Sequence, residues 1–232
     1  PRNKGGNGRG FIMGHIVEHI TNESDWHKGR SKGIGGSDVA CLLGYDPYKS
    51  NIDLWKEKTG RKQPQDIGNK PCVIYGKKAE DLLRQLFILD YPQYKVTHSP
   101  YDLHIHNDYP FIRASLDGEL LEILTSDKGI FECKTTEIHR PQDWKKWKNQ
   151  IPMNYFCQVL HYFAVDEDYK FCKLKAQIKS KEENGETILT TKHYHIDRFK
   201  HLNDIEQIIN AEIEFWHYVE ADKEPPLILP QI

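Results

Sequence analysis

The sequence predicts an α+β, or mixed α/β, fold in which helices flank a central mixed sheet. Helical patterns occupy the first third of the chain, and β-rich segments separated by turns occupy the middle. Strand and helix patterns share the last third. Segments grouped by type in this way are typical of a sheet covered by helices. The 232 residues are enough for one large domain with a core of its own.

The helices of the first third are indicated by their caps. Residues 21–30 and 50–60 are short helical patterns that begin at polar N-cap residues. Residues 33–44 are a glycine turn that leads into a helix capped by Ser37, and residues 71–87 form a longer helix with proline in its first turn. Four helices are therefore expected before the first strand.

The rest of the chain alternates between strands and helices. Three β-rich segments separated by turns are predicted to form a meander: 94–107, 111–124 and 129–137. Two helical patterns follow, at 140–150 and 153–165. The chain then has two strands and a last helix, at 171–180, 186–196 and about 198–221. This order places the sheet in the middle of the domain.

The composition excludes several classes of protein. Thirty-two basic and 34 acidic side chains give a formal net charge of −2, which still permits a local basic surface for nucleic acid. The five cysteines form no CxxC pair, so we expect free thiols in a reducing, intracellular compartment rather than a zinc ribbon or an iron–sulfur cluster. No apolar run approaches the ~20 residues that span a bilayer, so no membrane partner is expected.

The N-terminal segment has a composition of its own. Residues 1–22 are expected to be either a flexible arm or a segment foreign to the native chain, ahead of a single domain at 23–232. The opening PRNKGGNGRG is glycine-rich and basic, and no apolar stretch of a signal peptide follows it. Met13 is a candidate native start.

The segment GIFECKTTE, residues 129–137, carries an acid and a base two positions apart. Glu132 and Lys134 lie on one face of the predicted strand. Such a pair is most often a solvated salt bridge of little energetic weight. The apolar residues around Glu132 indicate a buried strand instead, and a buried acid and base need partners or a metal.

Asp117 is the second acidic residue of interest. It is followed by glycine, and this dipeptide is most simply a hairpin turn. A hairpin from about residue 113 to 135 would put Asp117 and Glu132 on adjacent strands. Two carboxylates on rigid strands suit Mg²⁺, or Mn²⁺ in its place. Lys134 beside them would orient or deprotonate an attacking water and stabilise a pentacovalent phosphate.

Two predicted helices offer further polar groups. Glu80 lies at the edge of the apolar face of 71–87, where it is either a solvated acid or a group that reaches a metal. Gln158 and Tyr162 are four residues apart and share one helix face, which is either a mixed surface or a polar pair aimed into a site. His161 lies off that face and is expected to be structural.

The glycine turn RSKGIGGSD is a candidate anion site. It offers Arg30, Ser37 and bare backbone at a helix N-terminus, although its spacing is neither that of a P-loop nor GxGxxG. Arg30 adds a bidentate phosphate donor.

A basic and aromatic segment follows the strand of Glu132. Trp144 and Trp147 alternate with three lysines, Lys145, Lys146 and Lys148. This pattern suits a nucleic-acid backbone with stacked bases. It equally suits an amphipathic helix with tryptophans inward and lysines outward, and the sequence leaves both open.

Histidine pairs offer a different class of enzyme. The chain has two such pairs, HIH at 104–106 and HYH at 193–195. Histidines spaced in this way occur in zinc sites, but they also occur on solvated faces of strands. A zinc hydrolase is the weaker alternative, because each pair is equally what a solvated strand face looks like.

Several of these segments together resemble a known family. GIGGSDVACLLGYDPYKSNIDLWKEKTG, YGKKAEDLLRQLF, ASLDG, FECKTT and IPMNYFCQVLHYFAV are similar to the YqaJ-like viral recombinase family, relatives of phage lambda exonuclease within the PD-(D/E)XK nuclease superfamily. The resemblance covers about residues 24–220. Leu116 stands where the superfamily has a proline, and Asp117 lies fifteen positions before Glu132, a longer gap than in a tight hairpin.

The resemblance implies a restriction-endonuclease-like core and a role for each candidate residue. Asp117 and Glu132 match the metal-binding acids, Lys134 the catalytic lysine, and Glu80 the helix glutamate near a second metal. The remaining matches are the QxxxY pair, Gln158 and Tyr162, and the residues that hold a DNA 5′-phosphate, Arg30 and Ser37. We add the backbone carbonyl of Cys133 as a metal ligand, since it lies between Glu132 and Lys134.

The activity implied is that of a Mg²⁺-dependent exonuclease. Family members digest one strand of linear duplex DNA from its 5′ end and leave a 3′ tail for a single-strand annealing protein. Lambda-type members form ring trimers. The implied location is the cytoplasm of a bacterial host, with a phage or prophage gene, or another intracellular setting. A site-specific or structure-specific endonuclease would share every catalytic residue. A silent DNA-binding module is disfavoured because the site residues are intact.

Overall fold

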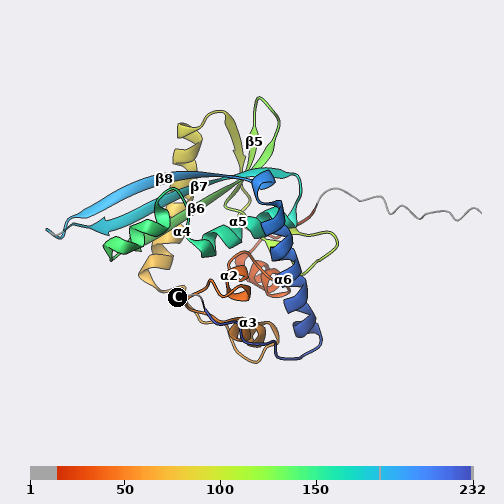
Figure 1. The fold of residues 1–232 in the computed structure, drawn as a ribbon. Helices are drawn as coiled ribbons and strands as arrows, with labels where there is room; N and C mark the ends of the chain where they lie inside the picture. Colours follow the sequence, from red (N-terminus) through yellow and green to blue (C-terminus); the bar gives the residue numbers. More distant parts are fainter. Residues whose placement is uncertain (1–14, 183, 231–232) are drawn as a thin grey trace, which may run out of the picture.

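The computed structural model describes residues 15–182 and 184–230, which form two sheets with helices around them (Figure 1). The larger sheet has the order β2-β5-β6-β7-β8 and the smaller one β1-β3-β4. The strands of the larger sheet are β2 (Tyr94–Thr97), β5 (Gly118–Glu122), β6 (Lys128–Ile138), β7 (Tyr169–Lys181) and β8 (Thr187–Asp197). Those of the smaller sheet are β1 (Ile16–His19), β3 (Asp102–Ile105) and β4 (Arg113–Ala114).

The helices agree largely with the predicted ones. The α-helices are α1 (Glu23–Ser31), α2 (Val39–Leu42), α3 (Asn51–Lys58), α4 (Pro71–Asp90), α5 (Met153–Val165) and α6 (Leu202–Glu220). Two 3₁₀ helices are η1 (Pro141–Trp147) and η2 (Arg198–Lys200). The predicted helix at 140–150 is thus the short 3₁₀ helix η1. The predicted cap Ser37 is wrong, because Asp38 occupies that position and makes no side-chain cap bond.

The larger sheet is mixed, as predicted. β6 and β7 are parallel, whereas β5 with β6 and β7 with β8 are antiparallel. The single meander is wrong, since segments 94–107 and 111–124 each divide between the two sheets. In the first, the proline at position 100 lies in the break between β2 and β3, where it cannot donate to a ladder. In the second, residues 115–117 separate β4 from β5.

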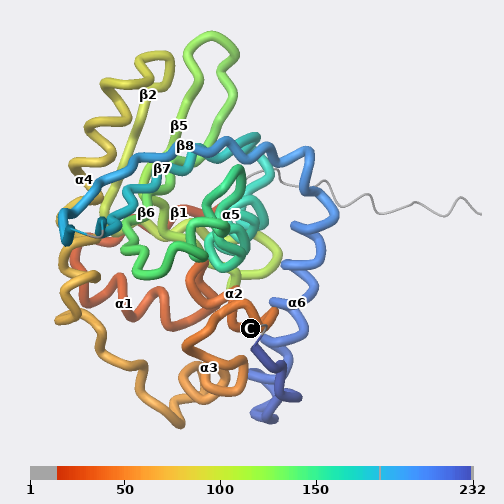
Figure 2. The backbone as a smooth tube through the Cα atoms, turned by 60° about the vertical axis from the view of Figure 1, so that its left-hand side comes forward, coloured from red at the N-terminus to blue at the C-terminus, as the bar shows by residue number. Residues whose placement is uncertain are grey.

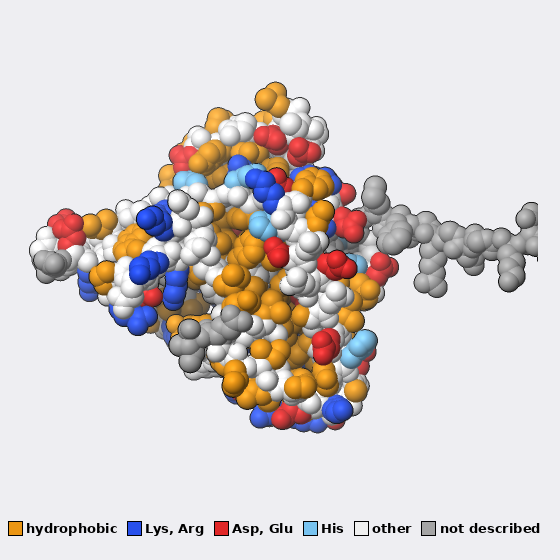
Figure 3. Space-filling view, in the orientation of Figure 1, with side chains coloured by type: hydrophobic (Ala, Val, Ile, Leu, Met, Phe, Trp, Pro, Cys, Tyr) orange, Lys and Arg blue, Asp and Glu red, His pale blue; other side chains and the backbone are white. Residues whose placement is uncertain are grey.

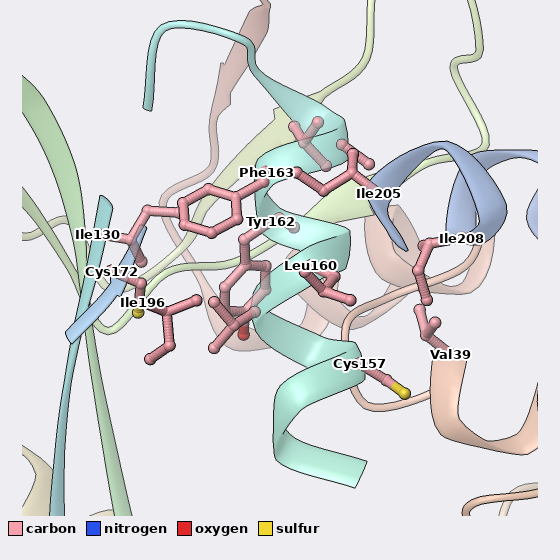
Figure 4. Packing of buried hydrophobic residues seen from close by; sticks show 14 of the residues in the cluster. Val39, Ile130, Cys157, Leu160, Tyr162, Phe163, Cys172, Ile196, Ile205 and Ile208 are labelled. Atoms are coloured by element: carbon pink, nitrogen blue, oxygen red, sulfur yellow. The ribbon is translucent and has the colours of Figure 1, made fainter. Parts of the chain in front are cut away.

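Two cores lie on the two faces of the larger sheet. In Figure 4, Phe163 and Tyr162 of α5 point toward the sheet, while Leu160 lies on the side of α6. The smaller core lies beneath α4, where the rings of Phe87 and Phe131 are 4.7 Å apart. Figure 2 shows α2 and α3 together on the side of α6, away from α4. The sheet is therefore held between α4 and α5, and both helices reach the same strand, β6.

The N-terminal residues that the structure describes belong to the fold. β1 pairs with β3, so that Ile16 lies opposite Ile105, and His15 Nδ1 is 2.7 Å from Asp166 Oδ2. Residues 15–22 of the predicted arm are thus held against the domain. The remainder of that arm, with Met13, lies outside the described residues. In the described ranges no helix combines the length and the apolar character that a bilayer crossing requires.

Candidate active site

Asp117 and Glu132 lie side by side at the start of β5. Gly118 pairs with Phe131, so the preceding residue, Asp117, comes next to Glu132 across the strands. The Cys133 N–H donates to Asp117 Oδ2 at 2.9 Å. Just before β5 begins, a carboxylate oxygen thus accepts a hydrogen bond from β6 that a backbone carbonyl would accept within the sheet. The structure brings together the two carboxylates as the sequence predicted, and the loop at 123–127 takes up the extra length between them.

Glu132 is a buried acid without hydrogen-bond donors. Its residue is 1% exposed, and neither carboxylate oxygen receives a hydrogen bond from the described residues. Lys134 Nζ lies 2.5 Å from Oε1, which makes an ion pair but not the geometry of a hydrogen bond. Burial, and then the negative charge of Asp117, raise the pKa of Glu132 to about 8. The ionised form of the Glu132 carboxylate is therefore poorly stabilised by the residues around it.

Lys134 projects from β6 toward α5. Its ammonium donates to Gln158 Oε1 at 2.9 Å and lies 5.0 Å from the centroid of the Tyr155 ring. Burial opposes its charge, but Glu132 and Asp117 outweigh burial and hold the pKa of Lys134 above its usual value. The side chain is therefore cationic at neutral pH. This state suits the stabilisation of an anion better than removal of a proton from water.

The polar face of α5 carries Tyr155, Gln158 and Tyr162, which are spaced by three and four residues. Gln158 Nε2 donates to the Tyr162 hydroxyl at 2.5 Å, which turns the amide oxygen toward Lys134. The glycine turn lies directly against this pair: a Cβ at Gly36 would be 2.7 Å from Tyr162 Cε1 and 2.9 Å from Gln158 Cγ. Only a glycine lets the turn approach so closely. The sequence did not identify Tyr155, although its spacing from Gln158 and Tyr162 is a helical signal.

Glu80 reaches the site from α4. Its side chain is partly exposed and lies 3.4 Å from Arg84, whose Nη1 donates to the Asp117 carbonyl at 2.7 Å. Burial, and then the charge of Asp117, raise the pKa of Glu80. Arg84 was not singled out from the sequence. The sequence gives little indication of its role, because an arginine one turn after a glutamate is common on helix surfaces. In the structure, however, Arg84 is buried.

Arg30 and Ser37 come together at the edge of a cavity. Arg30 Nη2 is 3.5 Å from Ser37 Oγ, and the guanidinium lies 4.6 Å from the centre of the Trp26 ring. The cavity has a volume of about 240 Å³ and is lined in part by Arg30, Lys49 and Lys58. With only four residues, α2 lacks the dipole expected from a longer helix, so side chains supply the positive charge.

The acid within this turn is neutralised. Asp38 lies 3.2 Å from Lys49 and 2.8 Å from Lys58, and its Oδ2 accepts the Gly35 N–H. Burial opposes the charge of Asp38, but the two lysines hold its pKa well below the usual value. The carboxylate therefore fixes the shape of the turn without leaving a bare negative charge beside Arg30.

The tryptophans of η1 point inward and its lysines outward. Trp147 is buried, and Trp144 packs against the core. Lys145, Lys146 and Lys148 are exposed. Figure 3 shows Lys and Arg side chains gathered on the lobe where β7 and β8 leave the body. Base stacking on Trp147 is therefore excluded in this arrangement, while the three lysines face solvent, with Lys146 3.4 Å from Asp143.

The residues around Asp117 fit a hard divalent cation. No three His, Cys, Asp or Glu side chains converge as a ready metal site in residues 15–182 and 184–230. The N–H and C=O of a strand residue face the same edge, so the Cys133 carbonyl also faces Asp117, beyond the last residue pair of β5 and β6. Two carboxylates and a carbonyl, completed by water and phosphate, match the preference of Mg²⁺. Such an ion would provide the partner that the two carboxylate oxygens of Glu132 lack among the described residues.

The histidine pairs lie elsewhere and have other partners. His104 is buried, with Nδ1 2.6 Å from His15 Nε2. His193 lies against the Tyr91 ring and His195 against the Phe171 ring. His161 is structural, as predicted: its ring lies between Glu212 at 2.5 Å and the Arg113 carbonyl at 2.9 Å.

Sequence comparison places the chain in a family. The family model of the YqaJ-like viral recombinase domain matches residues 25–169, more than half of the chain. The chain belongs to this family. The YqaJ-like chain is 32% identical over 194 residues to the uncharacterized protein YqaJ of Bacillus subtilis (strain 168), covering 83% of the chain and 55% of that relative. It is 27% identical over 162 residues to protein D345L of African swine fever virus, covering 60% and 44%. It spans about half the length of these relatives.

The fold of the YqaJ-like chain has solved counterparts. The alkaline exonuclease LHK-Exo from Laribacter hongkongensis matches with a TM-score of 0.62 and 18% identity, over 86% of this chain and 94% of that one. Its complex with dAMP matches over the same shares with a TM-score of 0.57 and 18% identity. The predicted core of PD-(D/E)XK type is thereby confirmed, as is the resemblance to the YqaJ-like family.

Proposed function

We propose that this chain is a metal-dependent deoxyribonuclease that digests one strand of linear duplex DNA from its 5′ end. The observation that carries the proposal is the buried carboxylate of Glu132, with no hydrogen-bond donor, between Asp117 and the cationic Lys134. Two acids beside a fixed ammonium suit phosphodiester hydrolysis, which needs positive charge around the scissile phosphate. Family membership supports the same reading.

Each residue has a distinct part in the proposed reaction. Asp117, Glu132 and the Cys133 carbonyl hold Mg²⁺, or Mn²⁺ in its place, with Glu80 nearby for a second ion or its water. When bound, the ion supplies Lewis-acid activation of water and phosphate. Lys134 donates to the phosphate oxygens and stabilises the charge that develops on them. Gln158 and Tyr162 hold Lys134 in place.

The Arg30 cavity favours an exonuclease over an endonuclease. A terminal 5′-phosphate carries more negative charge than an internal one, and Arg30 lines a cavity beside Ser37 that is suited to it. The same cavity is lined by Lys49 and Lys58, which are paired with the carboxylates of Asp38 and Glu57, so Arg30 is the cation left for the phosphate. Gly36 joins this turn to Gln158 and Tyr162, so a bound end would lie at a fixed distance from Lys134. The lysines of η1 are proposed to follow the duplex backbone.

The wider setting is proposed from the family. The product would be a 3′ single-strand tail for homologous recombination, passed to a single-strand annealing protein. The active form would be a homo-oligomer, by resemblance a ring trimer that threads the DNA. The reducing environment suggested by five free cysteines supports an intracellular location, with a phage or prophage gene as the source.

One digestion assay tests the function. Linear duplex DNA with a 5′-phosphate, the same duplex with a 5′-hydroxyl, and closed circular duplex are incubated with the protein and Mg²⁺. We expect digestion of the linear duplexes, faster with the phosphate, and intact circles. Equal cutting of closed circles would replace the exonuclease by an endonuclease on the same fold. No cutting of any DNA with Mg²⁺ or Mn²⁺ would overturn the proposed function.

A further inference from the structure

We propose that Tyr155 is a positioning residue that holds the ammonium group of Lys134 over its aromatic ring. This inference rests on the proposed function, because it gives Tyr155 a part in the same site. Lys134 Nζ lies 5.0 Å from the ring centroid. A ring face attracts a cation within about 6 Å, and the attraction is stronger where water is excluded.

The ammonium lies between a strand and a helix. On its own strand, Glu132 Oε1 is 2.5 Å away. On α5, Gln158 Oε1 accepts a hydrogen bond at 2.9 Å, and Tyr155, three residues earlier, presents its ring from the same helix face. The amide and the ring together oppose the pull of the Glu132 carboxylate.

A neutral ring suits this task better than a second acid. A lysine side chain is long and flexible, and Glu132 alone would draw it onto the carboxylate that the site needs for a cation. Another carboxylate on α5 would hold the ammonium but would repel the phosphate of a substrate. The ring of Tyr155 attracts the ammonium without adding negative charge.

The Tyr155 ring packs against a second aromatic residue. Its centroid lies 5.8 Å from that of Trp147, which is buried. The Trp147 carbonyl accepts hydrogen bonds from Lys192 Nζ at 2.9 Å and from the Tyr194 hydroxyl at 2.7 Å, both on β8. Among the described residues the Tyr155 hydroxyl has no hydrogen-bond partner. The ring face, rather than the hydroxyl, is thus the part in use.

Kinetics of ring variants test the proposal. Tyr155→Phe keeps the ring and should cleave linear duplex within about 2-fold of the wild-type kcat. Phenylalanines with one, two and three ring fluorines at position 155 keep the shape but weaken the attraction for a cation. We expect kcat to fall stepwise with each fluorine, by about 2- to 30-fold in total, with KM unchanged. Equal kcat across the fluorinated series would overturn the proposal.

A stability measurement tests the same contact without DNA. Urea unfolding of wild type, Tyr155→Leu, Lys134→Met and the double variant forms a double-mutant cycle. We expect a favourable coupling of about 2- to 30-fold in the unfolding equilibrium constant. If Tyr155→Leu does not fold, the trifluorinated ring replaces leucine in the cycle. Zero coupling overturns the proposal, whereas a wild type that cleaves no DNA but shows the coupling overturns only the proposed function.

Discussion

At the scale of single residues, the ammonium of Lys134 carries the proposed chemistry. Lys134→Ala removes the only cation that the structure places against Glu132 and Gln158 in the described part of the chain. We expect kcat on linear duplex to fall at least about 100-fold, as when a transition-state donor is removed. Binding of DNA, measured by gel shift with Ca²⁺ in place of Mg²⁺, should change little. The matched control is Lys223→Ala, an exposed lysine that should retain kcat; full activity of Lys134→Ala would contradict the assignment.

The charge of Glu132 links stability to pH. Its pKa is raised to about 8, so the folded state keeps a proton that the unfolded state releases near its ordinary pKa of 4.5. The contribution of this proton is complete below pH 4.5 and is lost as pH rises through about 8. Without metal, the free energy of unfolding should therefore decline across this range, and Glu132→Gln should flatten the decline.

The stabilisation that added Mg²⁺ gives should increase with pH, whereas the stability of the metal-free protein decreases. Metal binds the deprotonated carboxylate, so the rise in Tm that Mg²⁺ gives over EDTA should be larger at pH 8.5 than at pH 6. Differential scanning fluorimetry measures both. A Mg²⁺ effect that is absent, or that is equal in Glu132→Gln, would show that this acid is not a ligand.

At the scale of elements, α5 connects the proposed catalytic groups to the rest of the fold. His161 and Glu212 are fully buried and 2.5 Å apart, which fixes α5 against α6. Glu212→Ala leaves a buried histidine without its partner and should lower the free energy of unfolding by about 3 kcal/mol in urea titration. Glu206→Ala, an exposed acid on the same helix, should change it by less than about 0.5 kcal/mol. Equal effects of Glu212→Ala and Glu206→Ala would contradict the stabilising role given to the contact between His161 and Glu212.

The glycine turn makes the contact between the Arg30 cavity and α5. Gly36→Ala adds a methyl group 2.7 Å from Tyr162 and 2.9 Å from Gln158, so one of the elements has to move. We expect a stability loss of about 1–3 kcal/mol and a larger fall in kcat than the instability explains. Kinetics at a temperature where both proteins are folded measures this. A variant with wild-type kcat would show that the close approach is only packing.

At the scale of the whole molecule, the placement of the elements shows what the sequence could predict. The alternation of side chains along strands fixed the shared face of Glu132 and Lys134, and one hairpin brought Asp117 to them. Contacts between segments far apart in the chain carry no such local signal. The hydrogen bond from Arg84 to the Asp117 carbonyl depends on how α4 packs against β6, and the contact of Trp147 with Tyr155 depends on how η1 packs.

The same distinction explains the predictions that the structure corrects. The division into two sheets follows from which edges pair, and hydrophobic patterns do not record it. For η1, the alternation of tryptophan and lysine was equally consistent with a packed face and with a nucleic-acid face. The structure shows the packed face, with the rings inside and the cations outside, and contact of those cations with nucleic acid stays a proposal.

The exposed lysines at η1 set the expected salt dependence of DNA binding. Each phosphate contact adds about 0.9 to the slope of log Kd against log salt concentration. Replacing Lys145, Lys146 and Lys148 together by alanine should reduce that slope by up to about 2.7. Lys223→Ala, an exposed lysine of the C-terminal segment, should leave it unchanged. An unchanged slope in the triple variant would show that the DNA path does not run along η1.

The central claim is that Asp117, Glu132 and Lys134 form a metal-dependent nuclease centre, and Glu132→Gln tests it most directly. The substitution keeps the shape of a buried side chain and removes a charge that burial already disfavours. The measurement is the release of nucleotides from linear 5′-phosphorylated duplex with saturating Mg²⁺, alongside the Tm. We predict a Tm in EDTA at pH 8.5 equal to or above that of the wild type, with cleavage reduced at least about 1,000-fold. Wild-type cleavage by the folded Glu132→Gln variant would contradict the claim.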